Sequence, residues 1–250
     1  MILVAGGTGR LGRLVVRRLA DRGLRVCVLT RDPARAIGLP AEVLVGDVRR
    51  PLAFGHVDVV VSAMHGFAGP GGGTPQSVDR DGNANLVNAA KAVGADVVML
   101  SVQGAAADHP MLLHRMKYAA EEHLRACGVP WTVVRATAFR ELWVELLGRS
   151  RRPLVFGRGD NPINFVPVDE VAALVERAVI DRSLRGQVVE IGGPNLTFNQ
   201  LAATVRPELP RHVPPFAMKV LARIGPHALA RQVEAALAMD TIDLTWSPPG

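Results

Sequence analysis

The sequence predicts an α/β fold: a Rossmann-like, doubly wound parallel sheet with a small C-terminal helical lobe. Short apolar runs rich in β-branched residues alternate with segments whose apolar residues recur at helical spacing. The apolar runs are continuous, as expected for strands buried on both faces of a parallel sheet. The first run meets a glycine-rich turn, GGTGRLG at residues 6–12, which opens the first helical pattern. These three observations together favour a strand–turn–helix unit at the start of a parallel sheet.

The remaining elements follow in alternation along the chain. We expect strands at about residues 1–5, 25–30, 42–46, 57–62, 96–101 and 131–135. We expect helices at about residues 10–22, 77–93, 110–127, 168–181 and 197–205. A proline-rich segment then leads into an amphipathic stretch from about Phe216 to Met239. The length of 250 residues fits one domain over residues 1–250, to which about residues 139–250 contribute the smaller lobe.

Charge and composition narrow the classes of partner. The net charge is +6, but the arginines are scattered and no aromatic residues interleave with them. Solvated helix faces and an anionic cofactor account for this charge, so we expect no nucleic-acid partner. No apolar stretch approaches the roughly 18 residues of a membrane span, and we expect no signal peptide. The two cysteines, Cys27 and Cys127, lie in apolar settings, and we expect a cytoplasmic protein with reduced thiols.

The glycine-rich turn carries the first functional prediction. Gly6 and Gly9 are expected to adopt backbone angles closed to other residues and to admit a pyrophosphate. Gly12 is expected to let the helix pack closely against the strand. The N–H groups and the positive end of the helix would then meet the phosphates. The predicted dinucleotide-binding residues of this turn are Gly6, Thr8, Gly9, Arg10, Leu11 and Gly12.

This variant of the glycine motif resembles the atypical or extended branch of the short-chain dehydrogenase/reductase superfamily. The resemblance implies a Rossmann-like fold, a nicotinamide dinucleotide cofactor and hydride transfer. In such sheets the ligand lies at the C-terminal ends of the strands. Residues that directly follow each strand are therefore the next candidates.

Arg31 follows the second predicted strand, with Arg10 in the glycine turn and Arg35 nearby. Guanidinium groups bind a 2′-phosphate through paired hydrogen bonds, so NADP(H) is favoured over NAD(H). Asp32 is the counter-evidence, because an acidic residue at this strand end commonly holds the ribose of NAD. NAD(H) therefore stays open.

The third and fourth strands end in further cofactor candidates. Asp47 and Val48 resemble the adenine-side contact of the family. Ala63 and Met64 are expected to let the backbone run along the cofactor. The following segment, Gly66 to Pro75, is expected to be a mobile loop, acting either as a lid or as a plain linker.

The usual catalytic pair of the superfamily is missing. Ordinary members use a serine, then Tyr-x-x-x-Lys on the next helix. Here Ser101 ends the fifth strand and Lys117 fits the lysine, but Leu113 stands where the tyrosine should be. Tyr118 is the single tyrosine of the chain, and Glu122 lies four residues after it. No tyrosine of this chain can therefore form that pair.

Three candidate catalytic residues remain. Lys117 would bind the cofactor ribose or, if desolvated, transfer a proton. His114 lies three residues before it and titrates near neutrality; the alternative is an exposed helix histidine. Ser101 would orient a carbonyl. No Cys/His metal-ligand spacing is present, so no metal site is expected.

Later segments resemble the NmrA-like and isoflavone reductase-like branch. They comprise Lys117 with the acidic residues after it, a strand from Trp131 to Phe139 that contains an arginine, and residues 164–172. Asp169 there is expected to be a helix-start residue. The resemblance spans roughly residues 1–205, and it implies that the C-terminal segment caps a substrate cleft. A dimer or partner surface, or core packing alone, stays open for this segment. Phe67, Phe139 and Trp143 are candidate apolar walls for a flat substrate.

The sequence therefore predicts an NAD(P)H-dependent oxidoreductase that transfers hydride to a small apolar or aromatic carbonyl or enone, with natural-product tailoring as one setting. Its partners would be a small-molecule substrate and, as an open alternative, a second copy or another protein. The runner-up is an NmrA-like regulator that binds the dinucleotide without turnover. The missing tyrosine favours this second interpretation.

Overall fold

A computed structural model describes residues 1–66, 73–224 and 227–248. The chain divides into two compact units, which are considered separately. The sheet unit comprises Met1–Ala136 and Val168–Ile191, and the second unit comprises Thr137–Pro167 and Gly192–Gly250. The second unit begins close to residue 139, where the smaller lobe was predicted to begin, but it leaves out Val168–Ile191. Val168–Ile191 belongs to the sheet unit because its helix and strand return to the main sheet.

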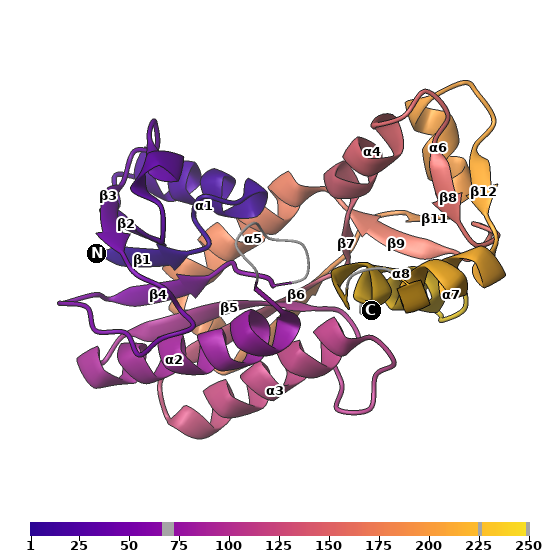
Figure 1. Cartoon of the computed structure of the whole chain (residues 1–250). Helices are drawn as coiled ribbons and strands as arrows, with labels where there is room; N and C mark the ends of the chain where they lie inside the picture. Colours follow the sequence, from indigo (N-terminus) through magenta and orange to yellow (C-terminus); the bar gives the residue numbers. More distant parts are fainter. Residues whose placement is uncertain (67–72, 225–226, 249–250) are drawn as a thin grey trace. The chain divides into compact units, whose positions relative to one another are not determined.

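The sheet unit is built on seven strands in the order β10-β6-β5-β4-β1-β2-β3 (Figure 1). Every pairing in this sheet is parallel. From β3 across to β6 the order is that of a doubly wound Rossmann sheet, whose direction of winding reverses between β1 and β4. The predicted fold class is thereby confirmed. The strands are β1 (Ile2–Ala5), β2 (Val26–Thr30), β3 (Glu42–Val45), β4 (Val59–Ser62), β5 (Asp96–Val102), β6 (Trp131–Ala136) and β10 (Gln187–Ile191).

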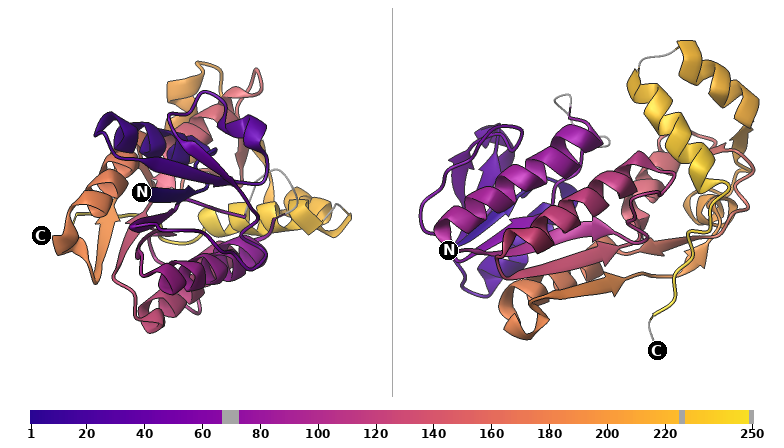
Figure 2. Two further views of the ribbon diagram at one scale, coloured as in Figure 1. Left: turned by 90° about the vertical axis from the view of Figure 1, so that its left-hand side faces the viewer. Right: turned by 90° about the horizontal axis from the view of Figure 1, so that it is seen from below.

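Helices cover both faces of this sheet (Figures 1 and 2). One face carries α1 (Arg10–Asp21) and α5 (Val168–Ile180). Glu176 of α5 joins the two helices by accepting from Arg18 of α1 and from Arg22 directly after it, at 2.7 Å each. The other face carries α2 (Asp81–Val93) and α3 (Leu112–Cys127), with the π-helix η2 (Pro75–Arg80) leading into α2. Short 3₁₀ turns, η1 (Pro33–Ala36) and η3 (Arg182–Leu184), complete the unit.

The core of the sheet unit is aliphatic. Leu3, Val60, Val97 and Val133 from the strands meet Leu86 of α2 and Leu124 of α3 in one buried cluster. No helix crosses from β3 to β4; residues 46–58 form a loop instead. Leu52 and Phe54 from this loop pack against the cluster. The sheet therefore keeps an apolar cover here without the usual crossover helix.

The described residues of the second unit form two small sheets and four helices. One sheet has the order β11-β9-β7 and the other pairs β12 with β8. Buried Asn164 of β9 ties this unit together, because it bonds both backbone groups of Gly193 and the hydroxyl of Thr137. The elements are β7 (Ala138–Phe139), α4 (Arg140–Gly148), β8 (Leu154–Phe156), β9 (Ile163–Val166), β11 (Asn195–Leu196), α6 (Phe198–Val205), β12 (Arg211–Val213), α7 (Pro215–Ile224) and α8 (His227–Met239).

The predicted amphipathic stretch from about Phe216 to Met239 is thus two helices, α7 and α8. Asp240, directly after α8, accepts backbone hydrogen bonds from Arg158 and Gly159 at 3.0–3.2 Å. This carboxylate holds the end of α8 to the turn after β8. No helix within the described ranges is long and apolar enough to cross a membrane.

Candidate functional site

The glycine turn between β1 and α1 is closed so tightly that side chains would not fit at two positions. Gly6 has a φ of +83°, and a Cβ there would lie 2.5 Å from the carbonyl oxygen of Ala63. A Cβ at Gly12 would overlap the carbonyl oxygen of Gly6 and lie 2.6 Å from Cα of Gly7. Such a cradle, formed by bare backbone at a helix N-terminus, fits a pyrophosphate.

Gly9 does not need the freedom expected of it. Its backbone angles, φ −83° and ψ 175°, are ordinary extended values, so that part of the prediction is wrong. Gly9 instead serves as the N-cap of α1 and makes no side-chain capping bond. The first turn of α1 therefore opens without a capping side chain of its own, which leaves this end of the helix suited to an anion.

The turn sits where the order of the sheet reverses. β1 pairs with β2 on one side and with β4 on the other. The Cβ position of Gly6 approaches both Ala63 and Met64, which directly follow β4. Ala63 and Met64, predicted to run along the cofactor, are thus brought against the glycine turn. Ligands of doubly wound sheets bind at this switch point.

Two residues near the end of β2, Asp32 and Arg13, make local hydrogen bonds. Asp32 accepts a hydrogen bond from the Ala34 amide at 3.0 Å and so caps η1, which gives its carboxylate a local structural partner. Arg13, which the sequence prediction did not include, donates to Thr8 in the turn at 3.2 Å and also to the Arg35 carbonyl. Its guanidinium thus bridges the glycine turn and η1. The arginine directly after Gly12 was the signal for it.

Asp47 and Val48 are held beside the sheet edge. Side-chain hydrogen bonds from Arg49 lower the pKa of the Asp47 carboxyl, and the closest contact is 2.6 Å. The carbonyl of Val48 accepts from Asn85 of α2 at 2.9 Å. The loop after β3 is therefore fixed to α2, although an ion pair already occupies the Asp47 carboxylate.

Lys117 lies deep in the sheet unit. Its side chain is 2% exposed. The ammonium donates to the carbonyls of Met64 at 2.9 Å and Leu100 at 3.0 Å, and it lies 3.1 Å from a carboxylate oxygen of Asp79. Asp79 is fully buried and was not predicted, because nothing in the sequence ties it to a lysine so far along the chain. Two donors of this ammonium therefore have carbonyl acceptors, and its contact with Asp79 is an ion pair without a hydrogen bond.

Ser101 is also engaged. Its hydroxyl donates to Glu121 at 2.5 Å, and Glu121 also bonds Arg135 of β6 at 2.7 Å and Arg125 at 2.8 Å. Ser101 is 1% exposed and Glu121 is fully buried. Because the Glu121 carboxylate accepts the hydrogen bond of the Ser101 hydroxyl, this serine is better suited to linking α3, β5 and β6 than to donating to a substrate carbonyl.

His114 is buried, at 8% exposure, and the alternative of an exposed helix histidine is wrong. Its ring stacks on His109 with centroids 3.9 Å apart and planes 9° from parallel. Burial, and then the charge of His109, lower the pKa of the His114 imidazole from 6.5 to about 3. The ring is therefore neutral at physiological pH. Its position in the first turn of α3 also disfavours a positive charge.

The remaining residues predicted from the sequence are the candidate apolar walls, the loop after β4 and Asp169. Trp143 packs edge-on against Phe198, with centroids 4.9 Å apart, inside the second unit. Phe139 is half-buried in β7, and Phe67 lies outside the described residues, as does most of the predicted Gly66–Pro75 loop. The predicted helix-start residue Asp169 lies in the first turn of α5. Within the described part of the chain, no group of His, Cys, Asp and Glu could hold a metal ion.

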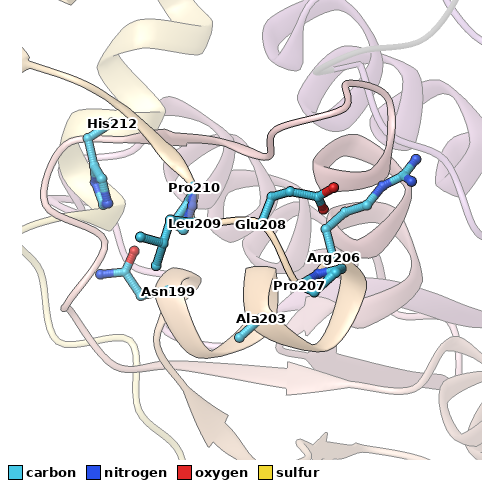
Figure 3. A pocket seen from close by; sticks show the side chains of 8 residues that line it. All are labelled: Asn199, Ala203, Arg206, Pro207, Glu208, Leu209, Pro210 and His212. Carbon is cyan, nitrogen blue, oxygen red and sulfur yellow. The ribbon is translucent and has the colours of Figure 1, made fainter.

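The second unit has a pocket of about 460 Å³ beside α6 (Figure 3). Three of its polar side chains contact backbone carbonyls: Asn199 that of Arg158 at 3.0 Å, Arg206 that of Gly148 at 3.3 Å, and His212 that of Gly157 at 3.1 Å. No predicted cofactor-binding or catalytic residue lines this pocket. The lining residues are Asn199, Ala203, Arg206, Pro207, Glu208, Leu209, Pro210 and His212.

Comparison with known proteins decides the family. A family model described as NAD(P)H-binding matches residues 6–181. The chain belongs to this NAD(P)H-binding family. The match begins at Gly6 in the glycine turn and runs through α5. Together with the seven-stranded sheet, it confirms the predicted resemblance to the atypical short-chain dehydrogenases/reductases.

Named relatives include reductases. The chain is 28% identical over 218 residues to an NAD(P)H azoreductase of Xenophilus azovorans, covering 82% of this chain and 72% of that protein. It is 29% identical over 192 residues to the photosystem II assembly factor Ycf39 of Synechocystis sp., covering 71% of this chain. The chain spans only 58% of that relative's length.

A solved structure shares the fold over nearly the whole chain. The triphenylmethane reductase of Citrobacter sp., complexed with NADP(H), superposes with a TM-score of 0.79 at 20% identity. The match covers 99% of this chain and 93% of that one. At this identity the likeness establishes the fold.

Proposed function

We propose that this chain is an NAD(P)H-dependent oxidoreductase that prefers NADP(H) and transfers hydride to a small apolar or aromatic acceptor such as a carbonyl or enone. One observation carries the proposal: the glycine turn, which tolerates no Cβ at Gly6 or Gly12, closes against Ala63 and Met64 at the switch point of the sheet. The reductase names among the relatives support the reaction class. When bound, the nicotinamide supplies the hydride.

The cofactor preference is proposed from the basic residues around the turn. Arg31 follows β2 directly, Arg10 and Arg13 flank the turn, and Asp32 is used as a cap. A 2′-phosphate would meet guanidinium groups here, whereas one oxygen of the Asp32 carboxylate, the acidic group that could hold the ribose of NAD, is already engaged in capping η1.

The proposed acceptor is one that needs little help from a protein-borne proton. Lys117, His114 and Ser101 remain the proposed polar groups nearest the reaction, but the ammonium and the hydroxyl already donate to internal acceptors. His114 is neutral, with a pKa of about 3, and a neutral imidazole is a weak acid. We therefore propose that solvent supplies the proton. Lys117 and Ser101 would then fix the backbone around the nicotinamide.

An acceptor panel tests the proposal. NADPH consumption is followed with an aromatic azo dye, a cationic triarylmethane dye, a quinone and a small enone. The proposal expects acceptor-dependent NADPH oxidation with at least one of them, and loss of that rate in Gly12→Ala. Dinucleotide binding without oxidation by any acceptor class would favour the second candidate.

The second candidate is a regulator that binds the dinucleotide without turnover. It is favoured by the absent Tyr-x-x-x-Lys pair, by the internal bonding of Lys117, and by a relative that is an assembly factor. A regulator predicts tight dinucleotide binding that changes affinity for a protein partner. An oxidoreductase predicts turnover of the purified chain alone.

A further inference from the structure

We propose that Asp79 and Lys117 form a positioning pair, which holds the backbone of Met64 and Gly66 against the glycine turn and thereby sets dinucleotide affinity. This inference rests on the proposed dinucleotide site. It assigns Lys117 an action through the backbone instead of contact with the reacting atoms, and it adds Asp79 as the partner that makes this action possible.

Lys117 and Asp79 both hydrogen-bond to the short backbone segment that follows β4. Lys117 donates to the carbonyl of Met64 at 2.9 Å. Asp79 accepts from the amide of Gly66 at 2.8 Å through its other carboxylate oxygen. The ammonium and the carboxylate lie 3.1 Å apart, with side chains 2% and 0% exposed. The residues after β4 are thus held at two points by one buried ion pair.

The backbone from Met64 to Gly66 borders the proposed cofactor site beside the glycine turn. The Cβ position of Gly6 lies 3.0 Å from the Met64 amide nitrogen. A shift of Met64 of even a fraction of an ångström would therefore open or close the glycine turn. Misplacing a binding wall by such amounts costs affinity, because the geometry of the bound phosphates is narrow.

Helix α2 is hydrogen-bonded both to Asp79 and to the end of β4. Asn83 of α2 donates to the Asp79 carbonyl at 2.7 Å and accepts from Ser62, the last residue of β4, at 2.5 Å. Asp79 itself is carried by the π-helix η2, a rare element that often marks functional positions. Thr74 and Ser77 cap the start of η2 reciprocally. The backbone after β4, the π-helix and α3 thus form one connected unit.

The ion pair is better suited to orientation than to stability. A buried ion pair stabilises a fold no better than apolar side chains of similar size, whereas removing one partner leaves a costly unpaired charge. The double substitution Asp79→Leu with Lys117→Met is therefore expected to fold. It should lose the hydrogen bonds to the Met64 carbonyl and the Gly66 amide without leaving a buried charge.

Dinucleotide titration and kinetics of this double variant test the pair. The expected result is an NADPH Kd and a cofactor KM raised about 10-fold or more, with kcat at saturating NADPH within about 3-fold of the wild type. The single variants should be no less impaired than the double, because the two residues act as a unit. The control is Arg18→Met with Glu176→Leu, which removes the ion pair between α1 and α5 and should leave the Kd unchanged.

Amide hydrogen exchange of a peptide over residues 62–66 provides a readout that needs no cofactor. Exchange should be faster in the double variant than in the wild type or the control. Unchanged exchange, or an unchanged Kd in a folded double variant, overturns the positioning pair. A fall in kcat with an unchanged cofactor KM also overturns it, because it would place Lys117 in proton transfer. Absence of NADPH binding by the wild type instead overturns the proposed function.

Discussion

At the scale of single residues, glycines and buried charges shape the site. The sequence motif was enough to predict Gly6 and Gly12, because steric exclusion at a turn is a local property. The burial of His114 and the partner of Lys117 could not be predicted, because each depends on residues brought near by folding. His114 is buried through its stack with His109, and Lys117 meets Asp79 only when η2 packs against α3.

Arg31→Ala tests the cofactor preference at this scale. Loss of a charge-assisted hydrogen bond to a 2′-phosphate is expected to weaken NADPH binding by about 10- to 100-fold. NADH lacks that phosphate, so its affinity should change little. The measurement is a pair of fluorescence titrations. Arg17→Ala, an equal loss of charge on the exposed side of α1, serves as the control; equal weakening by both substitutions would contradict the 2′-phosphate contact.

His114→Gln tests the neutral buried imidazole. A folded pKa near 3, below the ordinary 6.5, means that the unfolded chain binds the extra proton between these values. This contribution to stability is therefore present above pH 6.5 and is lost as the pH falls. Between pH 7.5 and 5 the wild type should lose about 2 kcal/mol of unfolding free energy more than His114→Gln. Urea unfolding at both pH values measures this, with His123→Gln on the same helix expected to behave like the wild type; parallel losses in wild type and His114→Gln would refute it.

At the scale of elements, periodicity was enough to place the sheet. The six predicted strands and the helices at α1, α3, α5 and α6 agree with the structure to within a few residues. The predicted helix over 77–93 begins as the π-helix η2, whose Asp79 bonds the Gly66 amide and pairs with Lys117 of α3. The lobe predicted over about residues 139–250 included α5 and β10 for a related reason. α5 and β10 return to the sheet by long-range pairing with β6, which no local pattern shows.

Gly12→Ala tests the strand–turn–helix element. The added methyl would overlap the Gly6 carbonyl, so α1 must shift away from β1. We expect about 1–3 kcal/mol of destabilisation together with loss of detectable NADPH binding. The matched control is Gly55→Ala, since no atom lies within 4 Å of its Cβ position. Thermal unfolding measures the stability of both variants, and NADPH titration measures their affinity. A Gly12→Ala protein as stable and as tightly binding as Gly55→Ala would contradict the close-packed turn.

At the scale of the whole molecule, the sheet unit carries the predicted cofactor residues, and the family match covers most of this unit together with Thr137–Pro167 of the second unit. The family model covers residues 6–181, which include every residue predicted to bind the dinucleotide. The second unit is organised by its own polar contacts, at Asn164 and Asp240. The substrate was the least predictable property, because acceptor choice depends on side chains that no shared motif specifies. The central claim is therefore the binding of a dinucleotide at the switch point of the sheet.

The most direct test of that claim is a calorimetric titration of the purified chain with NADPH, NADP, NADH and NAD. The account predicts saturable binding of one dinucleotide per chain, with the phosphorylated forms bound more tightly. Absence of binding by all four forms would contradict the account, and the glycine turn would then be a structural feature alone.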